Sequence, residues 1–143
     1  MAASIDPIYT REPEVANNGT TGMNQLVTAA AADYTGVSAN ASLVFTAGAD
    51  GSYIDRLRFK AGGTNVATVA RVYINNGSAP TTATNNTFYG EISLPATTAT
   101  NTAATAEIDY PLNIAIPATF RIYIGLATAV AAGWVVTPVA GNY

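Results

Sequence analysis

Large apolar and polar side chains alternate along short segments of this chain, most clearly in residues 119–126 (TFRIYIGL). From Phe120 to Leu126 every second side chain is large and apolar, whereas Arg121 and Tyr123 fall on the opposite face. Because successive strand residues point to opposite faces of a sheet, this alternation predicts a strand with one buried face. Weaker versions of the pattern predict further strands at 24–31, 42–47, 53–60, 65–74, 86–94, 106–110 and 134–139.

Residues 53–74 (YIDRLRFKAGGTNVATVARVYI) are the segment around which the other strands are expected to be organised. In its first half three basic residues alternate with apolar ones, and in its second half Val66 shares a face with Val72 and Ile74. The Gly-Gly pair at 62–63 supplies the positive φ angles that a tight turn requires. The segment is therefore predicted to be a β-hairpin with one solvent-exposed face and one buried face.

About eight short strands separated by turn signals, without a convincing helix, predict an all-β fold. The expected architecture is an antiparallel β-sandwich formed by residues 23–143, with an eight-stranded jelly roll as its topology. Gly90 is expected to mark a β-bulge. Residues 111–117 (PLNIAIP) are bracketed by prolines, so they are expected either to run along a sheet edge or to cross between sheets.

Residues 1–22 form a separate segment without sustained periodicity. Their apolar residues are isolated, so the segment cannot bury enough surface to fold alone. One interpretation is a frayed terminus. The other is an extended N-terminal arm that binds a partner or a neighbouring subunit through Ile5, Ile8, Tyr9 and Arg11.

Composition narrows the classes of function. Charged residues are only 10 % of the 143, against roughly 25 % in typical globular proteins, which suits a surface that packs against neighbours. The net charge is −3, so the chain lacks the basic footprint of a nucleic-acid-binding protein. It has no cysteine and no histidine, hence no thiol nucleophile and none of the commonest general bases. No cofactor, metal, nucleic acid or membrane is expected as a partner, and the protein is expected to be soluble and cytoplasmic in the cell that produces it.

Three carboxylates are the best candidates for catalysis. Glu107 and Asp109 lie two apart on one predicted strand and therefore point to one face, and Glu91 lies on another strand. A pair of carboxylates is what glycoside hydrolysis requires. The alternative, which we favour, is that they are solvated strand residues. A calcium loop at Asp50 and Asp55 lacks the spacing of such loops, and no enzymatic activity is expected.

Four of the six basic residues lie within the predicted hairpin. Arg56, Arg58 and Lys60 share one face of the first strand, with Arg71 expected across from them on the second. This cluster could contact an acidic partner surface. It could equally be a solvated sheet face whose charges pair with Asp55, Glu91 or Glu107. Four tyrosines expected to be exposed could likewise line a glycan or protein surface, or form cross-strand pairs: Tyr53, Tyr73, Tyr89 and Tyr123.

Four segments together resemble the capsid decoration, or cement, proteins of tailed bacteriophages. They are YIDRLRFKAGGTNVATVARVYINNG, NTFYGEISLPATTAT, EIDYPLNIAIP and TFRIYIGLATAVAAGW. The similarity lies in Ala, Thr and Asn richness, the lack of cysteine, and short strands with threonine-rich loops, over residues 23 to 143. It implies a jelly-roll or related β-fold, a homotrimer on the capsid exterior of the virion, and a non-enzymatic structural protein that clamps neighbouring major capsid protein subunits. It also implies that an extended arm reaches adjacent subunits.

A different class of function stays open beside this one. A receptor- or glycan-binding β-module of a phage tail or fibre would use the loops at 75–86 and 95–105. Binding of saccharides would distinguish such a module from a cement protein.

Overall fold

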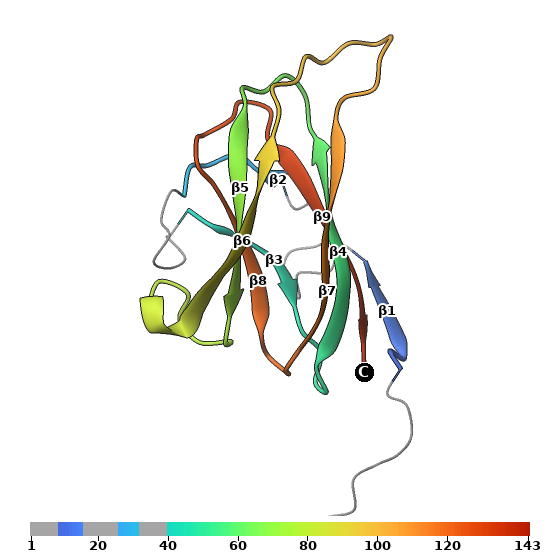
Figure 1. Cartoon of the computed structure of the whole chain (residues 1–143), viewed down its shortest axis with the longest axis vertical. Helices are drawn as coiled ribbons and strands as arrows, with labels where there is room; N and C mark the ends of the chain where they lie inside the picture. The colour runs from blue at the N-terminus through green and yellow to red at the C-terminus, as the bar shows by residue number, and fades with distance from the viewer. Residues whose placement is uncertain (1–8, 16–25, 32–39) are drawn as a thin grey trace, which may run out of the picture.

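The computed structural model describes residues 9–15, 26–31 and 40–143 as two antiparallel β-sheets packed face to face (Figure 1). Sheet A contains, in order, β1 (Glu12–Val15), β9 (Trp134–Asn142), β4 (Ser52–Ala61) and β7 (Glu107–Ile116), and β2 (Leu26–Val27) also pairs with β9. Sheet B contains, in order, β3 (Ser42–Thr46), β8 (Arg121–Leu126), β5 (Thr68–Asn75) and β6 (Asn86–Leu94). A 3-10 turn, Ala83–Asn85, precedes β6. The predicted all-β sandwich is confirmed.

The strands pair in a nested order along the chain. β2 pairs with β9, β3 with β8, β4 with β7 and β5 with β6, so each pair lies inside the preceding one. The chain thus resembles one long hairpin folded over on itself. Pairing of β4 with β9 and of β5 with β8 then joins these hairpins side by side into the two sheets.

The core lies between the sheets and is formed by the inward side chains that alternation predicts. Leu57 and Phe59 of β4 are fully buried, as are Ile122, Ile124 and Leu126 of β8. Each such side chain contributes about 1.5–3 kcal/mol to folding through removal of apolar surface from water. Other fully buried side chains of this core include Val27, Val44, Phe45, Ile54, Val72, Leu94, Trp134 and Val136.

The predicted hairpin at 53–74 is wrong, because β4 and β5 belong to different sheets. Residues 62–67 carry the chain from sheet A to sheet B, and the two strands face each other across the core. Alternation cannot distinguish this arrangement from a hairpin, since both bury one face of each strand. A Cβ on Gly62 would lie 2.7 Å from the carbonyl oxygen of Ala132, so close approach of backbone explains this glycine. Val66, expected to face inward, precedes β5 and is 58 % exposed.

The structure settles two further expectations about the strands. Residues 107–116 form one edge strand, β7, so the proline-bracketed segment runs along the edge of sheet A and does not cross between sheets. Pro111 is tolerated there because an edge strand leaves one row of N–H groups unpaired. The expected bulge at Gly90 is confirmed by a register shift between β5 and β6, where Val72 faces Gly90 but Tyr73 faces Phe88.

The predicted boundaries of several strands differ from the observed ones. Of the strand expected at 24–31, residues 24 and 25 lie outside the described residues, 26–27 form β2, and 28–31 are not a strand, although Ala30 forms an isolated bridge with Leu126. The strand expected at 134–139 extends to Asn142.

Part of the segment predicted as an arm belongs to sheet A. Residues Glu12–Val15 form β1, which lies at the sheet edge against residues 139–142 of β9 (Figure 1). Residues 1–8 and 16–22 lie outside the described residues, so the predicted domain boundary after residue 22 stays a prediction. Sequence periodicity missed β1 because its four residues, EPEV, include a proline and bury almost nothing.

Candidate interaction surfaces

The outer face of sheet A carries a strip of alternating charges on β4 and β7, which we call the charged strip: Asp55, Arg56, Arg58, Lys60, Glu107 and Asp109. Strand pairing places Arg58 opposite Asp109 and Lys60 opposite Glu107. The Arg58 guanidinium donates two hydrogen bonds to the Asp109 carboxylate, at 2.8 Å from Nε and 3.1 Å from Nη2. This two-point geometry gives more specificity than a single contact between point charges.

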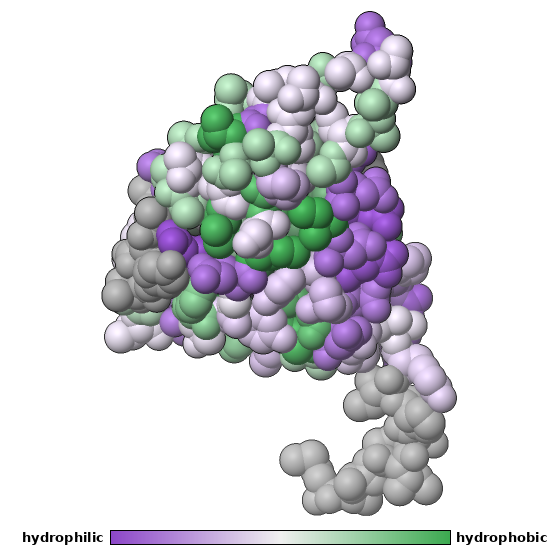
Figure 2. Space-filling view, turned by 45° about the horizontal axis from the view of Figure 1, so that its top comes forward, coloured by the Kyte–Doolittle hydropathy of each residue, from purple (hydrophilic) through white to green (hydrophobic). Residues whose placement is uncertain are grey.

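The remaining cations of the charged strip are paired as well. Arg56 contacts Asp55, and its Nε lies 3.7 Å from Asp109 Oδ2. Lys60 Nζ donates to the Thr105 carbonyl oxygen at 2.7 Å and lies 3.9 Å from Glu107. Figure 2 shows hydrophilic side chains gathered on the side of the molecule where β4 and β7 lie. Three basic and three acidic groups compensate one another, so the arrangement favours a solvated, self-paired face over a basic patch.

Hydrogen bonding from Arg58 holds the pKa of Asp109 below its usual value, and the same bond raises the pKa of Arg58. A glycosidase general acid needs the opposite shift, because it must keep a proton near neutral pH. Glu107 and Asp109 do share one face of β7, as predicted. Their arginine partners make them structural ion-pair residues in this geometry.

Arg71 does not join the charged strip, contrary to the prediction. It lies on β5 in sheet B, where strand pairing places it opposite Glu91. Its Nε is 3.6 Å from Glu91 Oε2, and its side chain is only 8 % exposed. The predicted carboxylate partner is therefore present, but Arg71 is too buried to meet another molecule through its guanidinium.

The two described residues of the predicted arm surface, Tyr9 and Arg11, are both exposed at the start of β1. Tyr9 is 74 % exposed, and with Thr10, Tyr53 and Tyr143 it lines a shallow hollow of about 260 Å³. The Arg11 backbone N–H donates to the Asn142 carbonyl oxygen at 2.7 Å, which fixes the end of the arm to β9. Ile5 and Ile8 lie outside the described residues.

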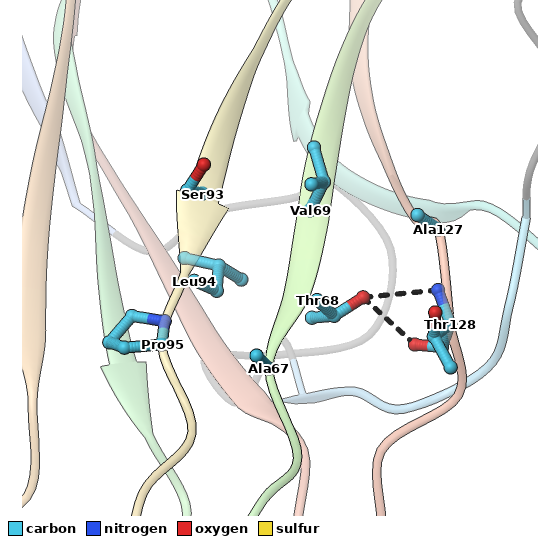
Figure 3. A pocket seen from close by; sticks show the side chains of 8 residues that line it. All are labelled: Ala67, Thr68, Val69, Ser93, Leu94, Pro95, Ala127 and Thr128. Atoms are coloured by element: carbon cyan, nitrogen blue, oxygen red, sulfur yellow. Dashed lines mark hydrogen bonds between the residues drawn. The ribbon is translucent and has the colours of Figure 1, made fainter.

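A larger hollow, of about 530 Å³, lies at one end of sheet B and was not predicted (Figure 3). Thr68 Oγ1 donates to the Thr128 carbonyl oxygen at 3.1 Å and accepts from the Thr128 N–H at 3.0 Å, which joins β5 to the loop after β8. Its walls are small apolar and hydroxyl-bearing residues without an ionisable group: Ala67, Thr68, Val69, Ser93, Leu94, Pro95, Ala127 and Thr128. Such a lining suits an uncharged group of a ligand and offers no side chain that acts as an acid or a base. No sequence pattern marks it, since it arises where three strands end together.

The four tyrosines predicted to be exposed differ in burial, and Tyr53 on β4 is half-buried. Tyr73 and Tyr123 are buried, at 1 % and 7 % exposure, and form a small cluster separate from the main core, which corrects their predicted exposure. Tyr89 is 38 % exposed beside Phe88 at 37 %, on edge strand β6. The Tyr89 hydroxyl donates to the Leu112 carbonyl oxygen of β7 at 3.4 Å, so Tyr89 bridges the edges of the two sheets. The Phe88 ring instead lies against Tyr73 of the same sheet, with 5.7 Å between ring centroids.

Asn65 organises the loops at one end of the sandwich, and sequence reasoning missed it. Its side chain is nearly buried and connects the 62–67 crossing to the loop before β9. Oδ1 accepts from the N–H groups of Ala132 and Gly133, at 2.9 and 3.0 Å, while Nδ2 donates to the Gly133 carbonyl oxygen at 2.8 Å. These bonds fix the positions of the 62–67 crossing and of the loop before β9 at that end of the sandwich.

Within the described ranges, no group of three or more His, Cys, Asp or Glu residues is arranged to hold a metal ion. Nor does that part of the chain contain a helix long and apolar enough to cross a membrane. No protein-family model, no curated protein and no solved structure matches the chain.

Proposed function

We propose that this chain is a capsid decoration protein of a tailed bacteriophage, a non-enzymatic staple that binds neighbouring major capsid protein subunits on the outside of the virion. The observation that carries the proposal is the way in which the predicted arm joins the folded domain. β1 is bonded to β9, while Tyr9 and Arg11 just ahead of it are exposed. The residues that precede Tyr9 are thereby tethered to a folded domain from which they can reach a partner.

The resemblance in sequence texture and the character of the surface support the same proposal. The charged strip is self-paired, and the larger hollow lacks ionisable groups, so neither provides a catalytic acid and base. A staple needs neither, because many weak contacts repeated by capsid symmetry add up to strong attachment. We propose a homotrimer as the bound form.

We further propose that the sandwich has jelly-roll topology. Its support is the nested pairing of β2 with β9, β3 with β8, β4 with β7 and β5 with β6. A jelly roll has eight strands in two sheets that share one core. Here sheet A has five strands because β1 and β2 both pair with β9, and sheet B has four.

The arm can be tested without disturbing β1. Deletion of residues 2–20 would remove β1 as well, so the sharper variant is Ile5→Ala/Ile8→Ala. Loss of two isoleucine contacts should cost on the order of 2–4 kcal/mol of binding and weaken attachment at least about tenfold. Co-sedimentation of purified protein with undecorated capsids measures this.

The matched control for the arm is Val66→Ala, which shortens an exposed apolar side chain outside the arm. It should bind like the unaltered protein. Equal capsid binding by the arm variant and the unaltered protein would reject a role for Ile5 and Ile8.

A receptor- or glycan-binding module of a tail or fibre is the second candidate, favoured by the exposed Phe88 and Tyr89 on an edge strand. Both rings offer a flat apolar face, and the Tyr89 hydroxyl adds a polar tip. Saccharide binding that is lost in Phe88→Ala/Tyr89→Ala, with capsid binding absent, would favour this candidate.

A further inference from the structure

Strands β1 and β2 lie in tandem along the same edge of β9. Glu12–Val15 pair with residues 142–139, and Leu26–Val27 pair with residues 135–134, both antiparallel to β9. The two strands therefore run in the same direction and occupy one continuous edge. They behave as a single strand whose two halves are separated in the sequence.

The chain between these halves is much longer than the gap that it must span. Val15 and Leu26 face Val139 and Val135, positions separated by about 14 Å of strand. The chain from Val15 to Leu26 reaches about 36 Å when extended. A direct continuation would need only a few residues, so the connection is longer than pairing of both strands within one chain requires.

The edge of β9 is shaped to receive this particular strand. A Cβ on Gly141 would lie 2.6 Å from Thr10 Cβ, so the absence of a side chain at Gly141 makes room for Thr10. Asn142 Nδ2 donates to Glu14 at 2.9 Å, and Asn142 Oδ1 accepts from Ser52 Oγ at 2.5 Å. The Ser52 contact orients the amide toward Glu14, so this edge recognises residues 10–14 by shape and by hydrogen bonding.

β1 itself has no apolar anchor in the core. Glu12, Pro13 and Val15 are exposed, whereas Val27 of β2 is fully buried. Ladder hydrogen bonds and the Glu14 contact hold β1 in place, and these are the same whether the strand comes from its own chain or from a second copy. Exchange of β1 between copies therefore sacrifices no contact.

We propose that β1 is an exchanged strand: in the homo-oligomer, residues 10–15 of each copy pair with β9 of the next copy. In a closed ring every copy gives one strand and receives one, so each β9 edge is filled. Pairing within one chain has the advantage of a high effective concentration. The contacts between subunits of the proposed homotrimer offset that advantage, and in this respect the inference rests on the proposed function.

A disulfide across the β1–β9 pair tests the exchange directly, since the natural chain contains no cysteine. Val15 and Val139 are direct cross-strand neighbours, a spacing that suits a disulfide. The full-length Val15→Cys/Val139→Cys variant is oxidised, denatured and run on a non-reducing gel. Exchange predicts that most chains become covalent multimers, which reducing agent returns to single chains.

The matched control is Tyr53→Cys/Ala115→Cys, a cross-strand pair of β4 and β7 inside one domain. It should close within single chains and leave the monomer band. In a second arm, Val15→Cys on a size-tagged chain is co-expressed with Val139→Cys on an untagged one. A covalent product of intermediate size, containing one chain of each kind, is expected only if β1 crosses between copies.

The outcomes separate the two proposals when the oligomeric state is measured by light scattering. An oligomer whose Val15→Cys/Val139→Cys chains close only within themselves would overturn the exchange and leave the proposed homotrimer standing. A monomer would contradict both. Failure of the disulfide to form, with the β4–β7 control closed, would also overturn the exchange.

Discussion

At the residue scale, asparagine side chains hold loops in position, although the composition alone would place these residues on a polar surface. Asn65 and Asn75 are buried, and both side chains bond backbone groups of neighbouring loops. Asn75 Oδ1 accepts from the Gly77 N–H at 2.9 Å, and its Nδ2 donates to Asn86 Oδ1 at 2.8 Å. Buried polar groups of this kind specify loop positions because leaving any partner unpaired is costly.

Asn65→Ala is expected to destabilise the protein by about 2–4 kcal/mol, because it leaves the N–H groups of Ala132 and Gly133 without their acceptor. Urea denaturation measures the change. The control is Asn76→Ala, an exposed asparagine that accepts from the Ser78 N–H, where a cost below about 1 kcal/mol is expected. Equal losses in both variants would contradict the role assigned to Asn65.

At the element scale, edge strands β6 and β7 meet where the two sheets come together. A Cβ on Gly90 of β6 would collide with the hydroxyl of Tyr110 on β7. Burial, together with the nearby Tyr89, raises the pKa of the Tyr110 hydroxyl. The glycine that was read from sequence as a bulge therefore has a second role, which is to accommodate an aromatic ring from the other sheet.

A double-mutant cycle tests this contact between the sheets. Gly90→Ala should destabilise the protein by about 1–3 kcal/mol, because the added methyl group overpacks the contact between β6 and β7. In the Tyr110→Phe background, which removes the colliding oxygen, most of that cost should disappear, giving a coupling energy of about 1 kcal/mol or more. Thermal or urea unfolding of the unaltered protein, the two single variants and the double variant measures this coupling energy. Additive effects of the two substitutions would contradict a direct contact between Gly90 and Tyr110.

Sequence patterning predicts the strands well and their partners poorly. The alternation of Leu57 and Phe59 with basic residues fixes which face of β4 is buried, since that follows from a period of two. The alternation cannot show whether β4 and β5 belong to one sheet or to two different sheets. Assignment of Arg71 to the charged strip failed for the same reason.

The site residues show the same division between local and long-range information. The exposed Arg58 was predicted from alternation, but its bond to Asp109 depends on a register between strands about fifty residues apart. The larger hollow and the pairing of β1 with β9 likewise depend on segments that meet only in the folded chain.

At the scale of the whole molecule, the described residues form two sheets that share one core. The core fills the space between the sheets, and the charged strip neutralises itself on one outer face. Under the proposed function, binding energy would come from the arm and from edge contacts repeated by capsid symmetry.

The proposed decoration function is best tested by cryo-electron microscopy of purified phage particles that contain this chain. If the proposal is right, copies of the chain lie at symmetry-related positions on the outside of the capsid, with residues 1–9 in contact with the major capsid protein. Absence of the chain from the head, or its presence only on the tail or fibres, would contradict the decoration function and favour the receptor-binding alternative.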